Sequence, residues 1–421
     1  MRDATGSSVR SGHATPAPVG VSFVSSYALA YMSVALMLIA PLLVTLALKI
    51  RSLVGTEQAP ASLALVTSVG GLLTVFAAPV FGRLSDRTPS SFGMRRPWML
   101  GGLTCGVLGI AVVAAAPNVA TVLAGWCLAQ LSFNALQAAL VAVLPDQVPL
   151  IQRGTVSGVL GITVPVAAVL GTFLVQLVDG SQAAMFLTPC AIGAALVVAF
   201  AVRLDDRRLD PQDAEPWSVR DLVVAFHVHP RRDPDFAWAF AGRFLFICAY
   251  AFLTTYQAFY LLEHVGSAES DVPRQVFIAT SVQSVVLVGA SLTAGRLSDR
   301  SGRRKVFVAV AALTYGAALF VVAASDTFTG FLVGMAISGL GFGTYMAVDL
   351  ALVADVLPDP ANTARDMGLF NIANALPYAL APAVAPAILT ASGDSYGVLY
   401  AVAGSCAVLA AVAVLPIRGV R

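Results

Sequence analysis

The feature that most constrains this chain is a series of twelve apolar runs, each long enough to cross a lipid bilayer as an α-helix. A spanning helix needs about 20 apolar residues. Spanning β-strands are shorter and alternate in hydropathy, and these runs do neither. The sequence therefore predicts an all-α membrane protein with twelve transmembrane helices, over residues 22–48, 61–82, 98–116, 120–144, 156–178, 184–203, 236–262, 275–295, 305–323, 328–352, 368–391 and 396–416.

The composition agrees with a lipid-facing surface. Only 11% of the residues are charged, whereas soluble chains carry about 25%. The net charge of +2 is too small to indicate a nucleic-acid partner. The five cysteines lie inside apolar runs without paired spacing, which predicts neither a disulfide framework nor a metal site. No cofactor is expected.

The distribution of basic residues predicts the orientation. An even number of spans places both ends of the chain on one side, and 21 of the 25 lysines and arginines fall there. Lys49, Arg51 and Arg274 fall on the opposite side, and Arg243 lies within a span. The positive-inside rule then places both termini in the cytoplasm. The preference for arginine over lysine, with abundant alanine and valine, indicates a bacterial source and hence the bacterial inner membrane.

Polar segments divide the chain into four parts. Residues 1–21 are rich in Gly, Pro and Ser and predict a disordered cytoplasmic tail. Residues 204–235 follow the sixth span, are highly charged and contain four prolines, which predicts a cytoplasmic linker. Residues 22–203 and 236–421 are then an N-terminal and a C-terminal six-helix bundle.

The two predicted bundles repeat the same motifs. GRLSDR occurs at 82–87 and again at 295–300, in each case between the second and third helix of its half. ALVAVLPD at 139–146 returns as ALVADVLPD at 351–359, between the fourth and fifth helix. The repeat indicates a duplicated unit, with two pseudo-symmetric bundles around a central cavity.

These motifs resemble a known family. Gly-x-x-x-Asp-Arg-x-Gly-Arg-Arg between helices two and three is similar to the signature loop of the major facilitator superfamily; it stands intact in the second half and is stretched to GRLSDRTPSSFGMRRPW in the first. The stretched form resembles the sucrose–proton and glycoside–cation symporter branches. The resemblance implies alternating access, a small-molecule substrate, a proton as co-substrate and a monomer.

The repeated loops are candidates for a gate on the cytoplasmic side. Their first glycines would let helices approach closely. Their aspartates can accept hydrogen bonds from a helix N-terminus of the other half, and their arginines can pair with the aspartates of the LPD motifs. The alternative is that the arginines only set the topology. The predicted gate comprises Gly82, Asp86, Arg87, Arg95, Arg96, Asp146, Gly295, Asp299, Arg300, Arg303, Arg304 and Asp359.

Two ionisable residues lie clearly within predicted spans, Arg243 in the seventh and Asp349 in the tenth. At 1.5 Å per residue both lie about 12–13 Å from the cytoplasmic end, so we expect them to pair. Charges at such depth are costly and mark function. In one interpretation Asp349 takes up and releases a proton. In the others the pair is permanent and fixes packing, or the residues bind substrate directly.

Neutral polar residues predict a polar cavity. Gln130, Asn134 and Gln137 share one helical face by their spacing. Hydroxyls and amides beside aromatic rings suit a sugar or glycoside, although each residue could equally serve interhelical hydrogen bonding. The candidate cavity residues are Tyr31, Gln130, Asn134, Gln137, Tyr250, Thr254, Gln257, Gln283, Tyr345, Asn371 and Asn374.

Sequence motifs of common enzyme classes are absent, so the chain is not expected to be an enzyme. The favoured function is proton-coupled transport of a sugar or glycoside-like solute. The alternative is proton-driven efflux of a drug-like or secondary metabolite, although the fifth helix does not match the exporter pattern clearly. The first half carries no clear carboxylate within a span, which leaves an uncoupled facilitator open.

Overall fold

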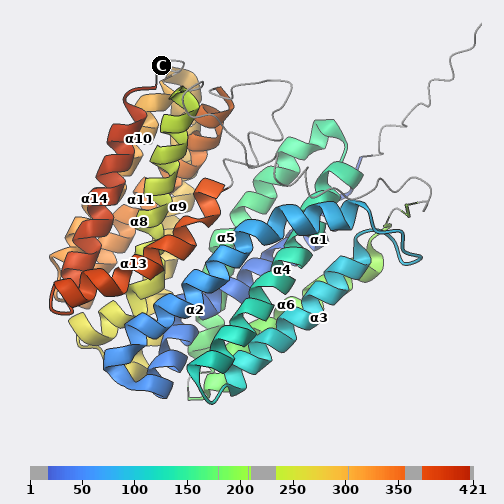
Figure 1. Ribbon diagram of the computed structural model, residues 1–421. Coiled ribbons are helices and arrows are strands. Elements are labelled where there is room, and N and C mark those ends of the chain that lie inside the picture. Colours follow the sequence, from blue (N-terminus) through green and yellow to red (C-terminus); the bar gives the residue numbers. More distant parts are fainter. Residues whose placement is uncertain are drawn as a thin grey trace, which may run out of the picture.

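The computed structural model describes residues 18–178, 180–206, 208–209, 234–301, 303–355 and 372–417, without the side chains of residues 78, 79, 299 and 350–355. Within these residues the secondary structure is entirely helical. The helices form two groups that lie side by side (Figure 1). The predicted all-α membrane fold is therefore confirmed.

The first group comprises the helices before the predicted linker. They are α1 (Val21–Ala40), the π-helical turn η1 (Pro41–Thr45), α2 (Leu46–Asp86), α3 (Arg96–Ala115), α4 (Val119–Gln147), α5 (Leu150–Leu177) and α6 (Gln182–Arg203).

The second group comprises the helices after it. They are α8 (Pro234–Phe259), the π-helical turn η3 (Tyr260–His264), the 3₁₀ turn η4 (Glu269–Asp271), α9 (Val272–Ser301), α10 (Arg304–Ala323), α11 (Phe328–Asp355), α13 (Pro377–Ala391) and α14 (Tyr396–Val414).

The first two predicted spans form one continuous helical run of 66 residues, Val21–Asp86. A straight helix of this length would measure about 100 Å, roughly three times the apolar thickness of a bilayer. The run breaks at Gly55, which has φ 75° and ψ 179°, a conformation open to glycine. The described residues contain 11 continuous helical segments that are apolar and long enough to span, and the break at Gly55 divides the first of them into two of the twelve predicted spans.

Local signals set several helix boundaries. Asn118 caps α4 by accepting a hydrogen bond from the Thr121 N–H at 2.9 Å, and Ser181 and Ser395 cap α6 and α14 in the same way. These side chains satisfy backbone donors that have no partner inside the helix. Helices α4 and α5 are separated only by Val148 and Pro149.

The same helix pairs pack in both groups, which is the structural form of the sequence repeat. In the first group α3 packs on α4, α2 on α4, and α1 on both α5 and α6. In the second group α10 packs on α11, α9 on α11, and α8 on both α13 and α14. Each pair occupies the same order within its half of the chain, so the two six-helix bundles are pseudo-symmetric.

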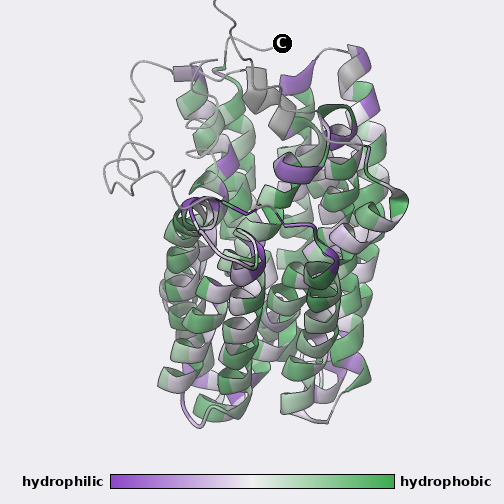
Figure 2. Ribbon diagram, turned by 90° about the vertical axis from the view of Figure 1, so that its right-hand side faces the viewer, coloured by the Kyte–Doolittle hydropathy of each residue, from purple (hydrophilic) through white to green (hydrophobic). Residues whose placement is uncertain are grey.

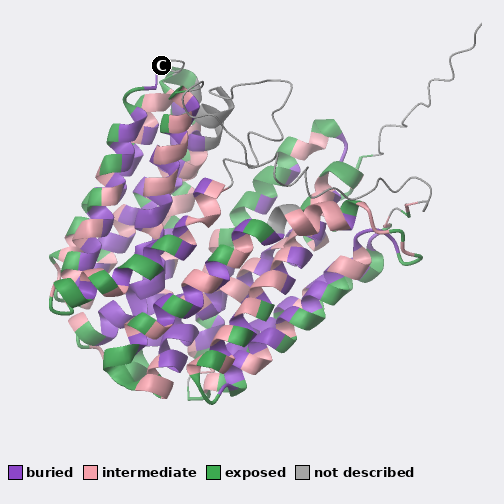
Figure 3. Ribbon diagram, viewed as in Figure 1, coloured by how far each residue is buried: buried purple, intermediate pink, exposed green. Residues whose placement is uncertain are grey.

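The outer surface is apolar. Hydrophobic residues predominate along the helices (Figure 2), and buried residues lie where helices face one another while exposed ones lie outside (Figure 3). Large apolar side chains such as Leu108, Val202 and Val310 are exposed. An apolar surface of this extent requires lipid around it, as expected of a multi-pass membrane protein.

A close approach between α9 and α11 depends on Gly343. A Cβ atom at this position would lie 2.3 Å from the carbonyl oxygen of Leu287. Small residues permit such backbone contact between membrane helices, and here the contact aligns two helices of the second bundle. By contrast, a Cβ at Gly289 of α9 would meet nothing within 4 Å.

We expect Gly343→Ala to lower the melting temperature of the purified protein in detergent, because forced overpacking costs about 1–3 kcal/mol. Gly289→Ala is the matched control, where the same methyl group enters open space and should be neutral or slightly stabilising, by up to about 1 kcal/mol. Equal melting temperatures for the two variants would contradict the predicted importance of this contact.

Candidate functional site

The two bundles together form a protein with two chemically different ends. The arginine-rich end carries the α2–α3, α4–α5 and α9–α10 connections. The opposite end carries the break at Gly55 and the segment from η3 to η4. The candidate site lies between these ends on α8, α11 and α13, and a second polar cluster lies at the arginine-rich end.

The structure brings Arg243 and Asp349 together as an ion pair. The Nη1 atom of Arg243 on α8 contacts Oδ2 of Asp349 on α11, and each residue is only 3% exposed. The Nε atom of Arg243 also donates to Oδ1 of Asn374 at 2.7 Å. The guanidinium therefore joins three helical segments of the second bundle.

Aromatic contacts continue this pair along α8 and α11. Phe246 stacks on Tyr345 with ring centroids 3.6 Å apart, and Tyr250 stacks on Phe342 at 4.3 Å. Helices α8 and α11 run in opposite directions, and the contacting residues on each helix are spaced at i, i+3 and i+7. The three contacts therefore follow one another along the two helices as successive rungs. We call Arg243–Asp349, Phe246–Tyr345 and Tyr250–Phe342 the three-rung ladder.

The ladder changes in character from one end to the other. Its charged rung and the Phe246–Tyr345 rung are almost fully buried, whereas Tyr250 and Phe342 are half-buried. Tyr378 of α13, also half-buried, meets Tyr250 edge to face at 6.3 Å. The three half-buried rings, Tyr250, Phe342 and Tyr378, form an aromatic patch that can stack with a planar solute.

The first bundle offers amides and hydroxyls instead. The Asn134 side-chain amide donates to the Gln130 carbonyl at 2.7 Å and to Thr74 Oγ1 at 3.3 Å, and the Thr74 hydroxyl donates to Gln130 Oε1 at 3.4 Å. Gln137 of the same face interacts with Tyr31 of α1. All five residues are half-buried, so they retain capacity to bind a polar group.

Other predicted cavity residues lie within helix packing. Thr254 and Gln257 are buried in α8, and the Thr254 hydroxyl donates to the Tyr250 carbonyl at 3.0 Å. The Gln283 amide donates to Ser338 Oγ at 2.9 Å between α9 and α11. The Gln283 contact thus holds two helices together, whereas the Thr254 bond lies within α8 itself. Asn371 lies outside the described residues.

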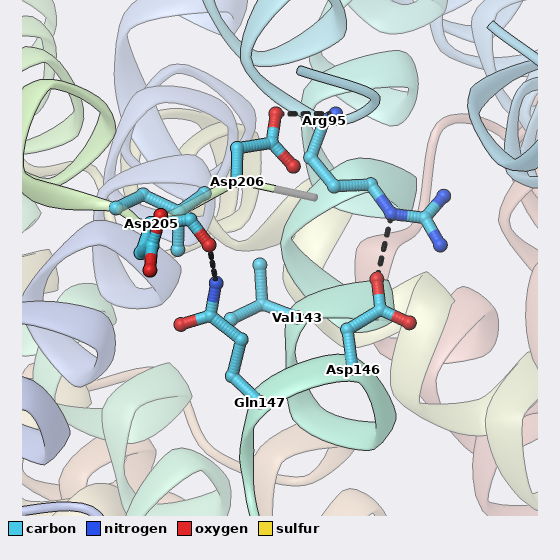
Figure 4. Close-up of a pocket in the computed structure, with 7 residues that line it drawn as sticks. Arg95, Val143, Asp146, Gln147, Asp205 and Asp206 are labelled. Atoms are coloured by element: carbon cyan, nitrogen blue, oxygen red, sulfur yellow. Dashed lines mark hydrogen bonds and ion pairs between the residues drawn. The ribbon is translucent and has the colours of Figure 1, made fainter. Parts of the chain in front are cut away.

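At the arginine-rich end, Arg95 forms the centre of a polar cluster (Figure 4). Its guanidinium contacts Asp86 Oδ1 at 2.6 Å and Asp146 Oδ2 at 2.9 Å, and donates to Ser85 Oγ at 2.8 Å. Burial alone would lower the pKa of Arg95, but the bonds to Asp146 and Asp86 outweigh it and raise that pKa. The cluster borders a cavity of about 220 Å³ that also reaches Asp205 and Asp206.

Two details of the predicted gate differ from the contacts that the described residues make in this conformation. A Cβ at Gly82 would meet nothing within 4 Å, and one at Gly295 would make an ordinary contact of 3.9 Å with Ala347, so neither glycine lies at a close helix approach here. Asp86 pairs with Arg95 of its own half, because the stretched loop folds back onto α2. The role of these residues in a closed gate stays a prediction.

The remaining predicted gate residues are only partly placed. The Arg96 guanidinium donates to the carbonyls of Val202 and Leu204 at the end of α6, and Arg87 is half-buried. In the second half Arg300 and Arg303 are exposed and Arg304 is half-buried. The Asp299 side chain and all of Asp359 lie outside the described part of the chain.

Several site residues escaped the sequence analysis. Thr74 lies in an apolar run, three residues after the Gly70–Gly71 pair. No polar residue three or four positions away marked it as part of a polar face. Phe246 and Phe342 were not among the candidate residues, although their offsets from Arg243 and Asp349 place them on the same helical faces. In the sequence Asp206 is one of many linker charges, and its place shortly after α6, beside Asp205, does not distinguish it from the others.

Comparison with known proteins shows the family. The chain matches the model of the Major Facilitator Superfamily over residues 22–272 and 271–420. It therefore belongs to this superfamily, and it is a membrane transporter of small molecules rather than an enzyme.

Curated relatives include the multidrug resistance protein MdtL of Escherichia coli O139:H28 and of Shigella boydii serotype 18, each 34% identical over 158 residues. The match covers 35% of this chain and 38% of the relative. The chain thus spans well under half the length of the curated relatives it matches.

Solved structures with the same fold include a point variant of the nucleoside transporter NupG, with TM-score 0.76 at 14% identity over 94% of this chain and 99% of that one. A bacterial homologue of the human lysosomal transporter Spinster, in an inward-facing and occupied conformation, gives TM-score 0.70 at 13% identity over 94% and 96%. Identities this low establish the fold and leave the substrate open.

We expect Arg243→Met and Asp349→Leu each to lower the melting temperature strongly, because removing one partner of a buried pair costs about 3–5 kcal/mol. The double variant should lose less than the sum, since it leaves no unpaired charge. Arg51→Met is the matched control: its pair with Glu263 spans 3.2 Å, with both side chains about a quarter exposed, and exposed pairs contribute about 0–1 kcal/mol. Additive losses in the double variant would contradict the coupling.

Proposed function

We propose that this transporter exports planar, aromatic, drug-like solutes in exchange for protons. The observation that carries the proposal is the aromatic patch beside the buried ion pair. Half-buried rings of Tyr250, Phe342 and Tyr378 suit a flat ring system, and the partial similarity to MdtL, named for multidrug resistance, points the same way.

A sugar is the less well supported substrate. Sugar recognition requires hydroxyl-binding groups around the whole ligand. Among the described residues, Thr74, Gln130 and Asn134 of the first bundle form a cluster of amides and hydroxyls, whereas the ladder of the second bundle presents stacked rings. A solute with an aromatic face and a polar edge matches both bundles. This combination favours the efflux alternative of the sequence analysis over its sugar interpretation.

The coupling proton binds at Asp349 in this proposal. When Asp349 is ionised, Arg243 holds it; when a proton neutralises it, Arg243 retains Asn374 as an acceptor at 2.7 Å. The pair can therefore open without leaving the guanidinium unbonded in the bilayer interior. Since Phe246 and Tyr345 stack directly between the charged rung and the aromatic patch, a shift of the pair is transmitted to the rings that bind solute.

The arginine-rich end faces the cytoplasm in this proposal, in agreement with the positive-inside rule. Three contacts that join the two bundles lie towards the opposite end: Arg51 pairs with Glu263 at 3.2 Å, the Tyr256 hydroxyl donates to the Pro60 carbonyl at 3.5 Å, and Phe173 meets Phe277 at 5.4 Å. A fourth lies deeper, where Gly71 of α2 approaches the backbone of Ala379 on α13. The conformation is accordingly an inward-facing one in a bacterial inner membrane, and the Arg95 cluster belongs to the cytoplasmic gate.

The test is solute-driven proton movement in everted membrane vesicles that hold the full chain and are acidified by respiration. We expect ethidium, a planar aromatic cation, to release protons from the vesicle interior, and sucrose to have no effect. Asp349→Asn should slow this release at least tenfold, the factor that corresponds to about 1.4 kcal/mol of barrier.

Tyr250→Ala tests the aromatic patch, and Phe320→Ala on the outer surface is its control, because that ring is 41% exposed. Ethidium exchange should weaken in Tyr250→Ala and persist in Phe320→Ala. Proton entry driven by sucrose, or ethidium exchange unchanged in Asp349→Asn, would refute the proposal.

A further inference from the structure

Helix α3 begins without a cap from its own neighbourhood. Its N-terminal flanking residue, Arg95, makes no capping hydrogen bond with its side chain. The first turn of a helix leaves backbone N–H groups that need an external acceptor. Here the acceptor comes from the end of the first bundle: Oδ2 of Asp206 accepts from the N–H of Arg95 and from the N–H of Arg96, both at 2.8 Å.

The stretched loop is shaped to admit this carboxylate. Gly93 has φ +105°, and a Cβ atom there would lie 2.1 Å from Oδ2 of Asp206. Any other residue at position 93 would therefore have a strained backbone, and its Cβ atom would also occupy the position of the carboxylate. Gly93, two residues before Arg95, therefore leaves the space that the Asp206 carboxylate occupies.

The contact is reciprocal, because α3 in turn caps α6. The Arg96 guanidinium donates to the carbonyls of Leu204 and, at 3.5 Å, Val202. The Gln147 amide of α4 donates to the Asp205 carbonyl at 2.6 Å, as Figure 4 shows. A carboxylate at a helix N-terminus and a cation at a helix C-terminus both complement the helix dipoles.

The carboxylate of Asp206 fixes the backbone of the residue whose side chain forms the gate cluster. Arg95 must reach Asp86 on α2 and Asp146 on α4 at once, at 2.6 and 2.9 Å. A long side chain gives up rotamer freedom to do so, and a fixed backbone reduces the loss. Arg95 is itself only 5% exposed, so its geometry depends on the turn that carries it.

We propose that Asp206 is a positioning residue of the gate: it clamps the first turn of α3 so that Arg95 bridges Asp86 and Asp146. Asp206 lies two residues after Leu204, the C-terminal flanking residue of α6, where the chain leaves the first bundle towards the second. The clamp thereby ties the gate to the segment that connects the two moving bundles. The functional meaning of the clamp rests on the gate role proposed above, whereas its structural effect can be measured without any substrate.

Hydrogen–deuterium exchange of the full chain in nanodiscs tests the proposal. In Asp206→Ala, amides in peptides over residues 94–98 should exchange about five to thirty times faster, the factor expected for loss of an N-cap. Peptides over 83–88 and 144–148 should also accelerate, because Arg95 no longer bridges them. Asp206→Asn keeps a capping oxygen and should behave like the natural chain.

The background Arg95→Gln separates positioning from local capping. In that background Asp206→Ala should still accelerate 94–98 but should no longer affect 83–88 or 144–148. Gly93→Ala, which displaces the carboxylate, should reproduce the pattern of Asp206→Ala if the latter does not fold. Peptides from α10 and α11 report general unfolding and should stay unchanged.

Acceleration confined to 94–98, or an equal effect at 83–88 with and without Arg95, would overturn the proposal, as would no change at all. These outcomes are independent of the transport test. If ethidium is not exported by the natural chain, the proposed substrate fails while the exchange pattern stands.

Discussion

The absence of water in the bilayer interior is the constraint on which the rest of this structure depends. Every backbone donor and acceptor must find a partner within the protein, and helices provide one for all residues except those at their ends. The described chain is helical throughout its spans, and its helix ends lie near polar side chains such as Asn118, Ser181 and Asp206. The cost of unpaired groups also explains why the deep charges Arg243 and Asp349 contact one another.

The duplicated scaffold carries different chemistry in its two copies. Equivalent helix pairs pack in both bundles, but the first presents amides and hydroxyls and the second presents the three-rung ladder. Alternating access requires only that the scaffold be symmetric enough for the bundles to rock against each other. The side chains on the inner faces are free to differ. In the proposed function, this difference allows one face to hold a polar edge of the solute and the other to hold its rings.

Much of the fold could be predicted from the sequence because hydropathy reports directly on the bilayer, and the repeats of GRLSDR fixed the division into two halves. The Arg243–Asp349 pair was also predictable, since both residues lie at matching depth in apolar runs. The partner of Asp86 and the role of Asp206 were not, because both depend on how an irregular loop folds back, and no periodicity describes a loop. Helical periodicity also could not separate Gln283, which holds two helices together, from Gln130, which remains half-buried.

The reciprocal capping of α3 and α6 bears on where this polypeptide can be divided. Two fragments that carry one bundle each could reassemble in a membrane, since each bundle has its own internal packing. A cut placed between Arg203 and Leu204 would separate α3 from its acceptor, Asp206, and from the Leu204 carbonyl to which Arg96 donates. A cut placed after Leu209 would keep both, so the natural border of the first bundle lies beyond its last helix, at the carboxylate that follows it.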